Sequence, residues 1–145
     1  MATTSAAPHL ASRLRLAVAR TARRLRQEAG GGLSPTLTAA LASIENHGPL
    51  TPSELADRER VKRPTATRLI GTLESSGLVV RASDPSDRRS SLIAITPAGR
   101  ELMRTLRTRK DAYLAQRLRK LSAEDRETLD RAADLLERLL EEDSA

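Results

Sequence analysis

Residues 61–91 constrain the fold most strongly, because this short stretch carries the pattern of a helix followed by that of a hairpin. In its first part, apolar residues three and four positions apart predict one buried helix face, formed by Ala66, Leu69, Ile70 and Leu73. The opposite face carries Pro64, Thr67, Arg68 and Gly71, with Arg63 and Thr65 at its N-terminal edge. This second face has no large apolar residue, and its guanidinium and hydroxyl groups suit a surface that reads a polar groove.

The residues after this helix predict a two-stranded hairpin. Residues 78–81 and 92–95 are rich in aliphatic and β-branched side chains and form the expected strands. Residues 84–87 have turn chemistry, and Arg88 and Arg89 place two fixed positive charges beside the turn. A helix with a groove-reading face followed by a basic hairpin predicts a winged helix-turn-helix. The alternative is a solvated surface helix beside an ordinary hairpin.

The charge of the chain favours a polyanionic partner. The net charge is +6 and the pI is near 10.9. The excess is concentrated at the N-terminus, where residues 1–33 contain six arginines and one acidic residue. Residues 34–95 contain eight basic and seven acidic residues, and six of these basic residues lie in the predicted helix and hairpin.

Several classes of function are disfavoured by composition. The chain has no cysteine, which excludes disulfides, thiolate metal sites and thiol redox sensing. It has one tyrosine and no other aromatic residue, so it offers no stacking platform for single-stranded nucleic acid. His9 and His47 are the only histidines, and neither has the spacing of a metal site or a nucleophile, so no enzyme activity, metal or cofactor is expected. No signal or membrane-spanning segment is recognisable, which predicts a cytoplasmic protein without a membrane partner.

The chain divides into four predicted segments. Residues 1–9 form a tip that we expect to be disordered, and residues 10–33 a helix stopped by three glycines. Residues 34–95 form the winged helix-turn-helix domain, in which Ser34 and Thr51 are expected helix caps and Gly77 ends the groove-reading helix. Residues 96–145 form two long helices, the first capped by Thr96. The fold class is therefore mainly α with a small β-hairpin wing.

The terminal helices predict a homodimer. They carry a leucine stripe too wide to leave in water, formed by Leu10, Leu14, Leu129, Leu135, Leu136, Leu139 and Leu140. A two-fold dimer would bury this stripe and place both groove-reading helices on one side of the assembly. The alternative is a helical hairpin folded back on the core of its own chain.

Five motifs, in their order and spacing, resemble those of the MarR family of transcriptional regulators. They are residues 48–56 (GPLTPSELA), 63–69 (RPTATRL), 73–81 (LESSGLVVR), 84–89 (DPSDRR) and 95–99 (ITPAG). The resemblance extends over residues 10–140. It implies an obligate homodimer that binds a pseudo-palindromic DNA duplex as a repressor and is released by a small, phenolic or anionic ligand.

The resemblance also implies roles for individual residues. The residues that would face the major groove are Arg63, Pro64, Thr65, Thr67 and Arg68. Arg88 or Arg89 would enter the adjacent minor groove, and Asp87 would position that arginine by a charge-assisted contact. Ser34, Thr36 and Thr51, at helix N-termini, would hold phosphates.

One position departs from the family pattern. Lys62 stands where the family commonly has a capping serine or threonine, and lysine cannot accept the capping hydrogen bond. Lys62 either contacts a phosphate or only weakens the start of the helix. A sequence-tolerant architectural DNA-binding protein is the second functional hypothesis, since basic charge alone would suffice for it. The sequence does not indicate which effector binds, or where.

Overall fold

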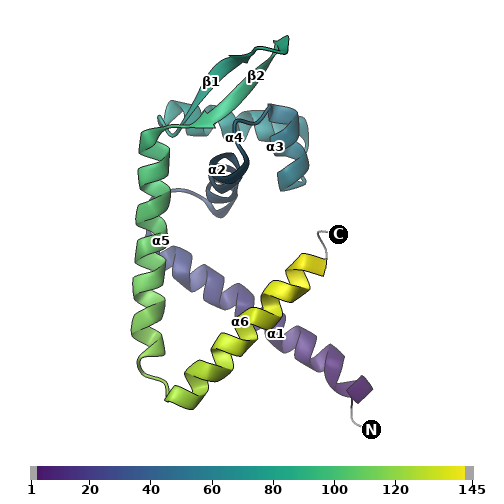
Figure 1. The fold of residues 1–145 in the computed structure, drawn as a ribbon, viewed down its shortest axis with the longest axis vertical. Helices are drawn as coiled ribbons and strands as arrows, with labels where there is room; N and C mark the ends of the chain where they lie inside the picture. The colour runs from purple at the N-terminus through teal and green to yellow at the C-terminus, as the bar shows by residue number, and fades with distance from the viewer. Residues whose placement is uncertain (1–2, 143–145) are drawn as a thin grey trace.

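The computed structural model describes residues 3–142, which form six helices and one two-stranded antiparallel sheet (Figure 1). The elements are α1 (Thr3–Ala29), α2 (Pro35–His47), α3 (Pro52–Glu59), α4 (Arg63–Ser75), β1 (Val79–Asp84), β2 (Asp87–Ile95), α5 (Pro97–Leu118) and α6 (Ala123–Glu142). The predicted fold class, mainly α with one hairpin, is confirmed.

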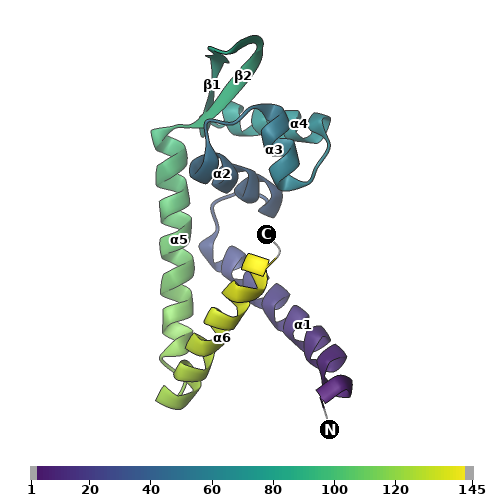
Figure 2. The same cartoon turned by 45° about the vertical axis from the view of Figure 1, so that its right-hand side comes forward.

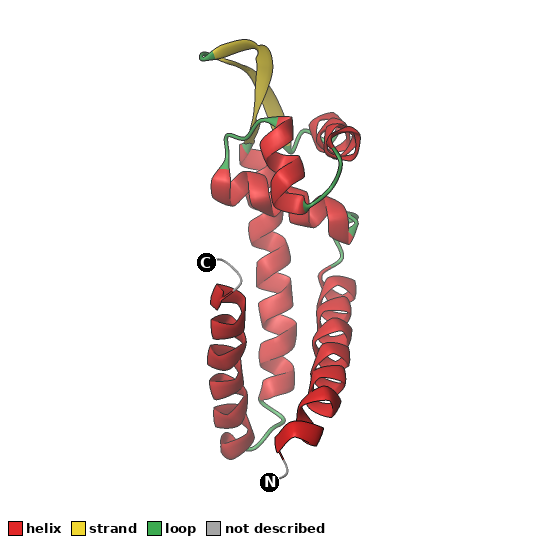
Figure 3. Cartoon of the chain, turned by 90° about the vertical axis from the view of Figure 1, so that its right-hand side faces the viewer, coloured by secondary structure: helices red, strands yellow, loops and turns green. Residues whose placement is uncertain are grey.

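The elements separate into a compact head and a helical stalk. The head contains α2, α3, α4 and the hairpin, and α5 runs from the base of the hairpin away from the head (Figure 2). Figure 3 shows α1, α5 and α6 extending below the head. The two terminal helices therefore do not fold back over the head.

One hydrophobic core holds the head together. Its largest fully buried side chains come from α2, α3, α4 and β2, and they are Leu41, Ile44, Leu55, Ile70, Leu73 and Ile93. Leu50 pairs with β2 as an isolated bridge: its N–H donates to the Ile93 carbonyl at 3.0 Å, and its carbonyl accepts from the Ile93 N–H at 2.7 Å. Met103 and Leu106 of α5 close the core from the stalk side.

Serine and threonine hydroxyls cap four helices, and three of these caps, at Ser34, Thr51 and Thr96, are predicted from the sequence. The hydroxyls of Ser34, Thr51, Thr96 and Ser122 each accept a hydrogen bond from the backbone N–H three residues later, at 3.1–3.2 Å. Each cap satisfies one of the N–H groups that the first turn of a helix leaves without a partner.

α1 begins earlier than predicted. Residues 3–8 belong to the helix, so the prediction of a disordered tip over residues 1–9 is wrong for this part; residues 1 and 2 lie outside the described residues. The alanines at positions 6 and 7 favour helix, and Pro8 lies close enough to the start to remove only one backbone hydrogen bond. The predicted stop is confirmed, because Gly30, Gly31 and Gly32 all have positive φ angles.

The strands of the hairpin are longer than predicted. Pairing continues from Val79–Ile95 through Ser83–Ser91, and a register shift follows at Asp84. The polar residues of this ribbon pair through backbone hydrogen bonds, and a hydrophobic pattern does not reveal such pairing. As a consequence, Arg88 and Arg89 lie within β2 and not in a loop.

Candidate nucleic-acid interface

α3 and α4 form the helix-turn-helix pair. The turn between them contains Arg60, which has a left-handed backbone conformation with φ 54° and ψ 44°. The Arg60 N–H donates to the Asp57 carbonyl at 3.3 Å, and the Val61 N–H donates to the Ala56 carbonyl at 3.0 Å. These bonds give partners to carbonyl groups at the C-terminus of α3, and the chain then turns and enters α4.

α4 has one buried and one exposed face, as the sequence predicts. Ala66, Leu69, Ile70 and Leu73 are buried in the core. The residues of the opposite face that are exposed are Arg63, Pro64, Thr67 and Arg68, while Thr65 and Gly71 are half-buried. The Arg68 side chain forms no hydrogen bond or ion pair with any residue from 3 to 142. Its five N–H donors are therefore available to a ligand.

Lys62 occupies the N-cap position of α4 without capping it. Its backbone angles, φ −72° and ψ 152°, are those of a normal N-cap, but its side chain makes no capping hydrogen bond. The sequence-based expectation of an uncapped helix start is confirmed.

We predict that Lys62→Ser raises the free energy of unfolding by about 1 kcal/mol, because the serine hydroxyl can accept the missing bond in the existing backbone geometry. Urea denaturation measures the effect, and Lys62→Ala, which removes the charge without adding a cap, is the matched control. Equal stability of the two variants would contradict the prediction. Both variants also test whether Lys62 contacts a DNA phosphate. Loss of one phosphate contact lowers the slope of the logarithm of the DNA-binding constant against the logarithm of the salt concentration by about 1.

The wing tip is held in shape by two aspartates. The Asp84 carboxylate accepts hydrogen bonds from the Ser86 hydroxyl at 2.7 Å and the Ser86 N–H at 2.9 Å. These bonds, led by the hydroxyl, lower the pKa of Asp84 below its ordinary value and favour its ionised form. The Asp87 carboxylate accepts from the Arg89 N–H at 2.9 Å. Asp87 therefore contacts the backbone of Arg89, whereas the resemblance implies a contact with an arginine side chain.

The wing is also fixed to α4 and α5, by contacts that the sequence did not predict. The Arg81 Nε of β1 lies 3.1 Å from the Glu74 carboxylate of α4. The Thr96 hydroxyl donates to the Gly77 carbonyl at 2.7 Å while capping α5. The only sequence signal for the ion pair is the opposite charge of Glu74 and Arg81, which without the fold does not distinguish them from other surface charges. These contacts set the position of the wing relative to the exposed face of α4.

Comparison with known proteins identifies the family. A model described as the MarR family matches residues 33–91. An HTH-type transcriptional regulator of Mycobacterium tuberculosis is 40% identical over 134 residues, which is 92% of this chain and 94% of the relative. The chain belongs to the MarR family. The family consists of DNA-binding transcriptional regulators and not of enzymes, so the expectation from the two histidines agrees with it.

Solved structures agree with this MarR fold. A crystal structure from Pseudomonas aeruginosa, described as that of a transcriptional regulator protein, is 32% identical with a TM-score of 0.85 and covers 94% of this chain and 97% of that chain. The structure of a MepR mutant from Staphylococcus aureus bound to an oligodeoxyribonucleotide is 21% identical, with a TM-score of 0.69, and covers 91% of this chain and 96% of that chain. The MepR likeness shows the fold alone.

The three residues predicted to hold phosphates do not lie together in this MarR chain. Thr51 lies at the base of the wing, beside the Leu50–Ile93 bridge. Ser34 and Thr36 lie at the other end of α2, a helix of 13 residues and about 20 Å. The hydroxyl of Ser34 accepts its capping bond, so its O–H can still donate to a phosphate oxygen. The Thr51 hydroxyl both accepts its capping bond and donates to the Glu54 carboxylate at 3.2 Å, so a phosphate contact there would use backbone N–H groups.

The leucines predicted for dimerisation are mostly exposed. The exposed ones are Leu10, Leu14, Leu129, Leu135, Leu139 and Leu140. Leu136 is half-buried and shares a groove with Leu14 and Val18 of α1. The alternative of a hairpin folded back on the core is not observed. Within residues 3–142, none of the helices combines the length and the hydrophobicity that a membrane span requires.

Proposed function

We propose that this MarR-family protein binds a specific pseudo-palindromic DNA duplex as a homodimer. In this proposal, the exposed face of α4 reads base edges in the major groove, and Arg88 or Arg89 enters the adjacent minor groove. The observation that carries the proposal is the division of α4 into a fully packed inner face and an outer face with a free guanidinium at Arg68. Arginine binds the O6 and N7 atoms of guanine in a bidentate manner, which gives base discrimination.

Contacts at the base of the wing support a two-groove mode of binding. The Glu74–Arg81 ion pair and the Thr96–Gly77 hydrogen bond link this base to α4 and α5, which lowers the entropy cost of placing the wing when DNA binds. Lys62 and the backbone N–H groups at the start of α3 would contribute contacts to phosphates, which position the protein without specifying sequence.

The homodimer is supported by the exposed leucines of α1 and α6. Leu139 is 57% and Leu140 is 69% exposed, and a monomer in water rarely retains so many large apolar side chains on neighbouring helices. A two-fold interface would cover both helices at once. Sedimentation equilibrium would measure the assembly, and a monomer at micromolar concentration would contradict this part of the proposal.

The regulatory part of the proposal is repression that a small anionic or phenolic ligand relieves. Its support is the family resemblance. The alternative, a sequence-tolerant architectural protein, would use the same basic surface. Within residues 3–142, α4 and the wing present no exposed aliphatic wedge at the tip that would enter a base step.

A fluorescence-anisotropy titration tests the function, with DNA fragments taken from upstream of the gene that encodes this protein in its host. Scrambled DNA is the control, and two salt concentrations separate the electrostatic contribution. We expect one fragment to bind at least ~10³-fold more tightly than scrambled DNA, with a footprint spanning two major grooves about 34–36 Å apart. Equal binding with a steep salt dependence would favour the architectural alternative, and no binding at low salt would contradict both hypotheses.

We predict that the double variant Arg88→Ala, Arg89→Ala binds the selected fragment about tenfold or more weakly, because it removes two positive charges from the wing. Successive side chains of a strand point to opposite faces, so one of the two single variants should account for most of the loss. Anisotropy measures the affinity and sedimentation the assembly. A monomeric double variant would show that the wing has been wrongly assigned.

A further inference from the structure

The linker between α1 and α2 joins the stalk to the head and places little restraint on the angle between them. It begins with three glycines, Gly30, Gly31 and Gly32, whose φ angles are 65°, 94° and 73°. Glycine has the widest choice of backbone conformations, so such a segment does not by itself fix the direction of the helix that follows it. α5 packs against both α1 and α2 (Figure 2). It is therefore the element placed to restrain this angle.

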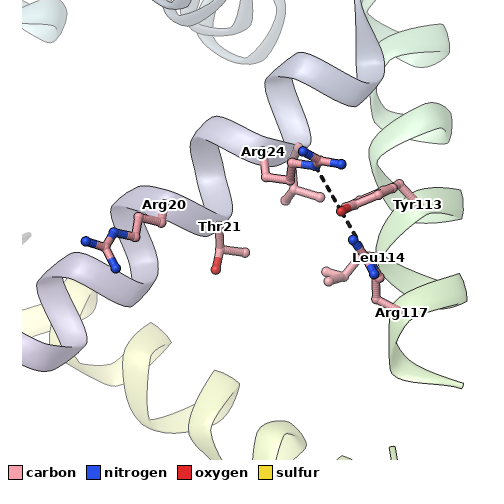
Figure 4. Close-up of a pocket in the computed structure, with 7 residues that line it drawn as sticks. Arg20, Thr21, Arg24, Tyr113, Leu114 and Arg117 are labelled. Carbon is pink, nitrogen blue, oxygen red and sulfur yellow. Dashed lines mark hydrogen bonds between the residues drawn. The ribbon is translucent and has the colours of Figure 1, made fainter. Parts of the chain in front are cut away.

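On the stalk side of the linker, hydrogen bonds hold α5 to α1. The Nη1 of Arg109 donates to the Ala29 carbonyl oxygen, at the last residue of α1, over 2.9 Å. This carbonyl is one of those that the end of a helix leaves without a backbone donor. Further from the head, the Nε of Arg24 donates to the Tyr113 hydroxyl oxygen at 3.1 Å (Figure 4). α1 is therefore bonded to α5 up to the residue that precedes the glycines.

On the head side of the linker, one ion pair joins α2 to α5. The Nη2 of Arg107 contacts the carboxylate of Glu45. The Glu45 side chain is only 11% exposed, whereas the side chains of the Arg104–Glu101 pair within α5 are 73% and 60% exposed. A carboxylate that is mostly withdrawn from water depends on its cation, while an exposed pair contributes little. Among the ion pairs that residues 3–142 form with one another, Arg107–Glu45 is the only one between head and stalk.

This ion pair adds orientation to an apolar contact. Met103 and Leu106 of α5 already pack in the core of the head. Apolar packing is non-directional, so it holds the head against α5 without specifying one rotation. A guanidinium N–H must point at its acceptor, which is a directional requirement. Arg107 and Arg109, two positions apart on α5, thus make directional contacts on both sides of the glycine linker.

We propose that Arg107 and Arg109 are positioning residues that fix the angle between the head and the stalk across the glycine linker. This inference rests on the proposed function, because its consequence appears in a homodimer. The partner would be held at α1 and α6 of the stalk, whereas α4 lies in the head, so the angle at the linker sets the separation of the two α4 helices. Neither arginine needs to touch DNA.

A fixed separation makes a dimer selective for one spacing of its two half-sites. One base pair added between the half-sites moves one of them by about 3.4 Å along the duplex and turns it by about 35° around the axis. A dimer with a fixed head angle cannot follow this change with both α4 helices. A dimer with a loose head angle can follow it, at the cost of a weaker preference.

The separation of the two heads can be measured without DNA. The chain has no cysteine, so Ser75→Cys, at the exposed end of α4, provides one spin-labelling site per protomer. Double electron–electron resonance then gives the distribution of distances between the two labels of a dimer. With the Arg107–Glu45 pair intact we expect a narrow distribution, and in Arg107→Gln and Glu45→Gln, each made in this labelled background, a wider one.

The two substitutions separate the contact from a general effect of charge. Arg107→Gln removes a positive charge and Glu45→Gln a negative one, so an effect of net charge would act in opposite directions. Loss of the contact acts in the same direction, and the double variant should be no wider than either single variant. Arg109→Met, which cannot donate to the Ala29 carbonyl, should widen the distribution as well. Arg104→Gln, whose ion pair lies within α5, is the matched control and should keep the narrow distribution.

DNA binding gives the second readout. The unmodified protein should bind duplexes with one base pair added or removed between the half-sites at least ~10-fold more weakly than the selected fragment, and Arg107→Gln should reduce this ratio to about threefold. Circular dichroism checks that each variant is folded. The proposal is overturned if Arg107→Gln and Glu45→Gln leave both readouts unchanged, if they act in opposite directions, or if Arg104→Gln acts equally. A failure of the proposed function is distinguishable, because the unmodified protein itself would then give no dipolar signal or bind no fragment.

Discussion

Gly99→Ala is expected to lower the free energy of unfolding by about 3 kcal/mol, as overpacking at a rigid site does. A Cβ atom at this position would overlap the backbone carbonyl oxygen of Leu78 and lie 2.7 Å from the Cγ1 of Ile95. The carbonyl belongs to the chain entering the hairpin, and its oxygen already accepts the Thr96 N–H at 3.0 Å. It cannot move without disturbing the junction between α5 and the wing.

Gly71→Ala is the matched control for this variant. Gly71 lies inside α4, and a Cβ atom there would meet nothing within 4 Å. The same chemical change should therefore stabilise the protein by roughly 0.5–1 kcal/mol, since alanine loses less backbone entropy than glycine in a helix. Urea denaturation at one fixed protein concentration measures both variants, because dimerisation would make the stability depend on concentration. Shifts of the same sign and size would contradict the steric argument.

The parts of the fold that local sequence determines were predicted correctly. The buried stripe of α4 follows from 3.6-residue periodicity, and the caps at Ser34, Thr51 and Thr96 follow from hydroxyl residues placed before helical patterns. The left-handed Gly77, with φ 74°, is also a local requirement. In these cases one segment contains all the information needed.

The features that the sequence left undetermined depend on contacts between distant segments. The Leu50–Ile93 bridge and the Glu74–Arg81 ion pair join residues whose neighbourhood is fixed only by the fold. The Arg24–Tyr113 contact joins residues 89 positions apart in the chain, whereas Arg117 lies only four positions from Tyr113 on the same helix. The contact between Arg24 and Tyr113 was not predicted, because periodicity does not indicate which charged residues of another helix will meet a given side chain.

Part of the candidate interface could be predicted from the sequence. Exposure of Arg63, Thr67 and Arg68 followed from the periodicity of α4 and is confirmed. The hydrogen-bond partner of the Asp87 carboxylate could not be predicted, because the choice between a backbone N–H and an arginine side chain depends on the path of the turn. The roles of these residues toward DNA remain predictions.

Arg68→Ala is expected to weaken binding to the selected DNA by about 1–3 kcal/mol and to relax specificity at one base pair in each half-site. The reason is that an arginine in the major groove donates two N–H groups to guanine, and alanine leaves those acceptors without a partner. The folded state should be unaffected, because the Arg68 side chain is exposed and forms no hydrogen bond or ion pair with the described residues.

Anisotropy with matched and single-base variant duplexes measures this loss, and Arg119→Ala, an exposed arginine at the far end of α5, controls for the loss of one charge. If Arg68 reads a base, the loss is large on the selected duplex and small on scrambled DNA. If Arg68 only contacts a phosphate, the loss is equal on both and the salt slope falls by about 1. No loss on either duplex would mean that the exposed face of α4 does not enter the groove. The wing and Lys62 would then have to account for binding, through contacts that carry little sequence information.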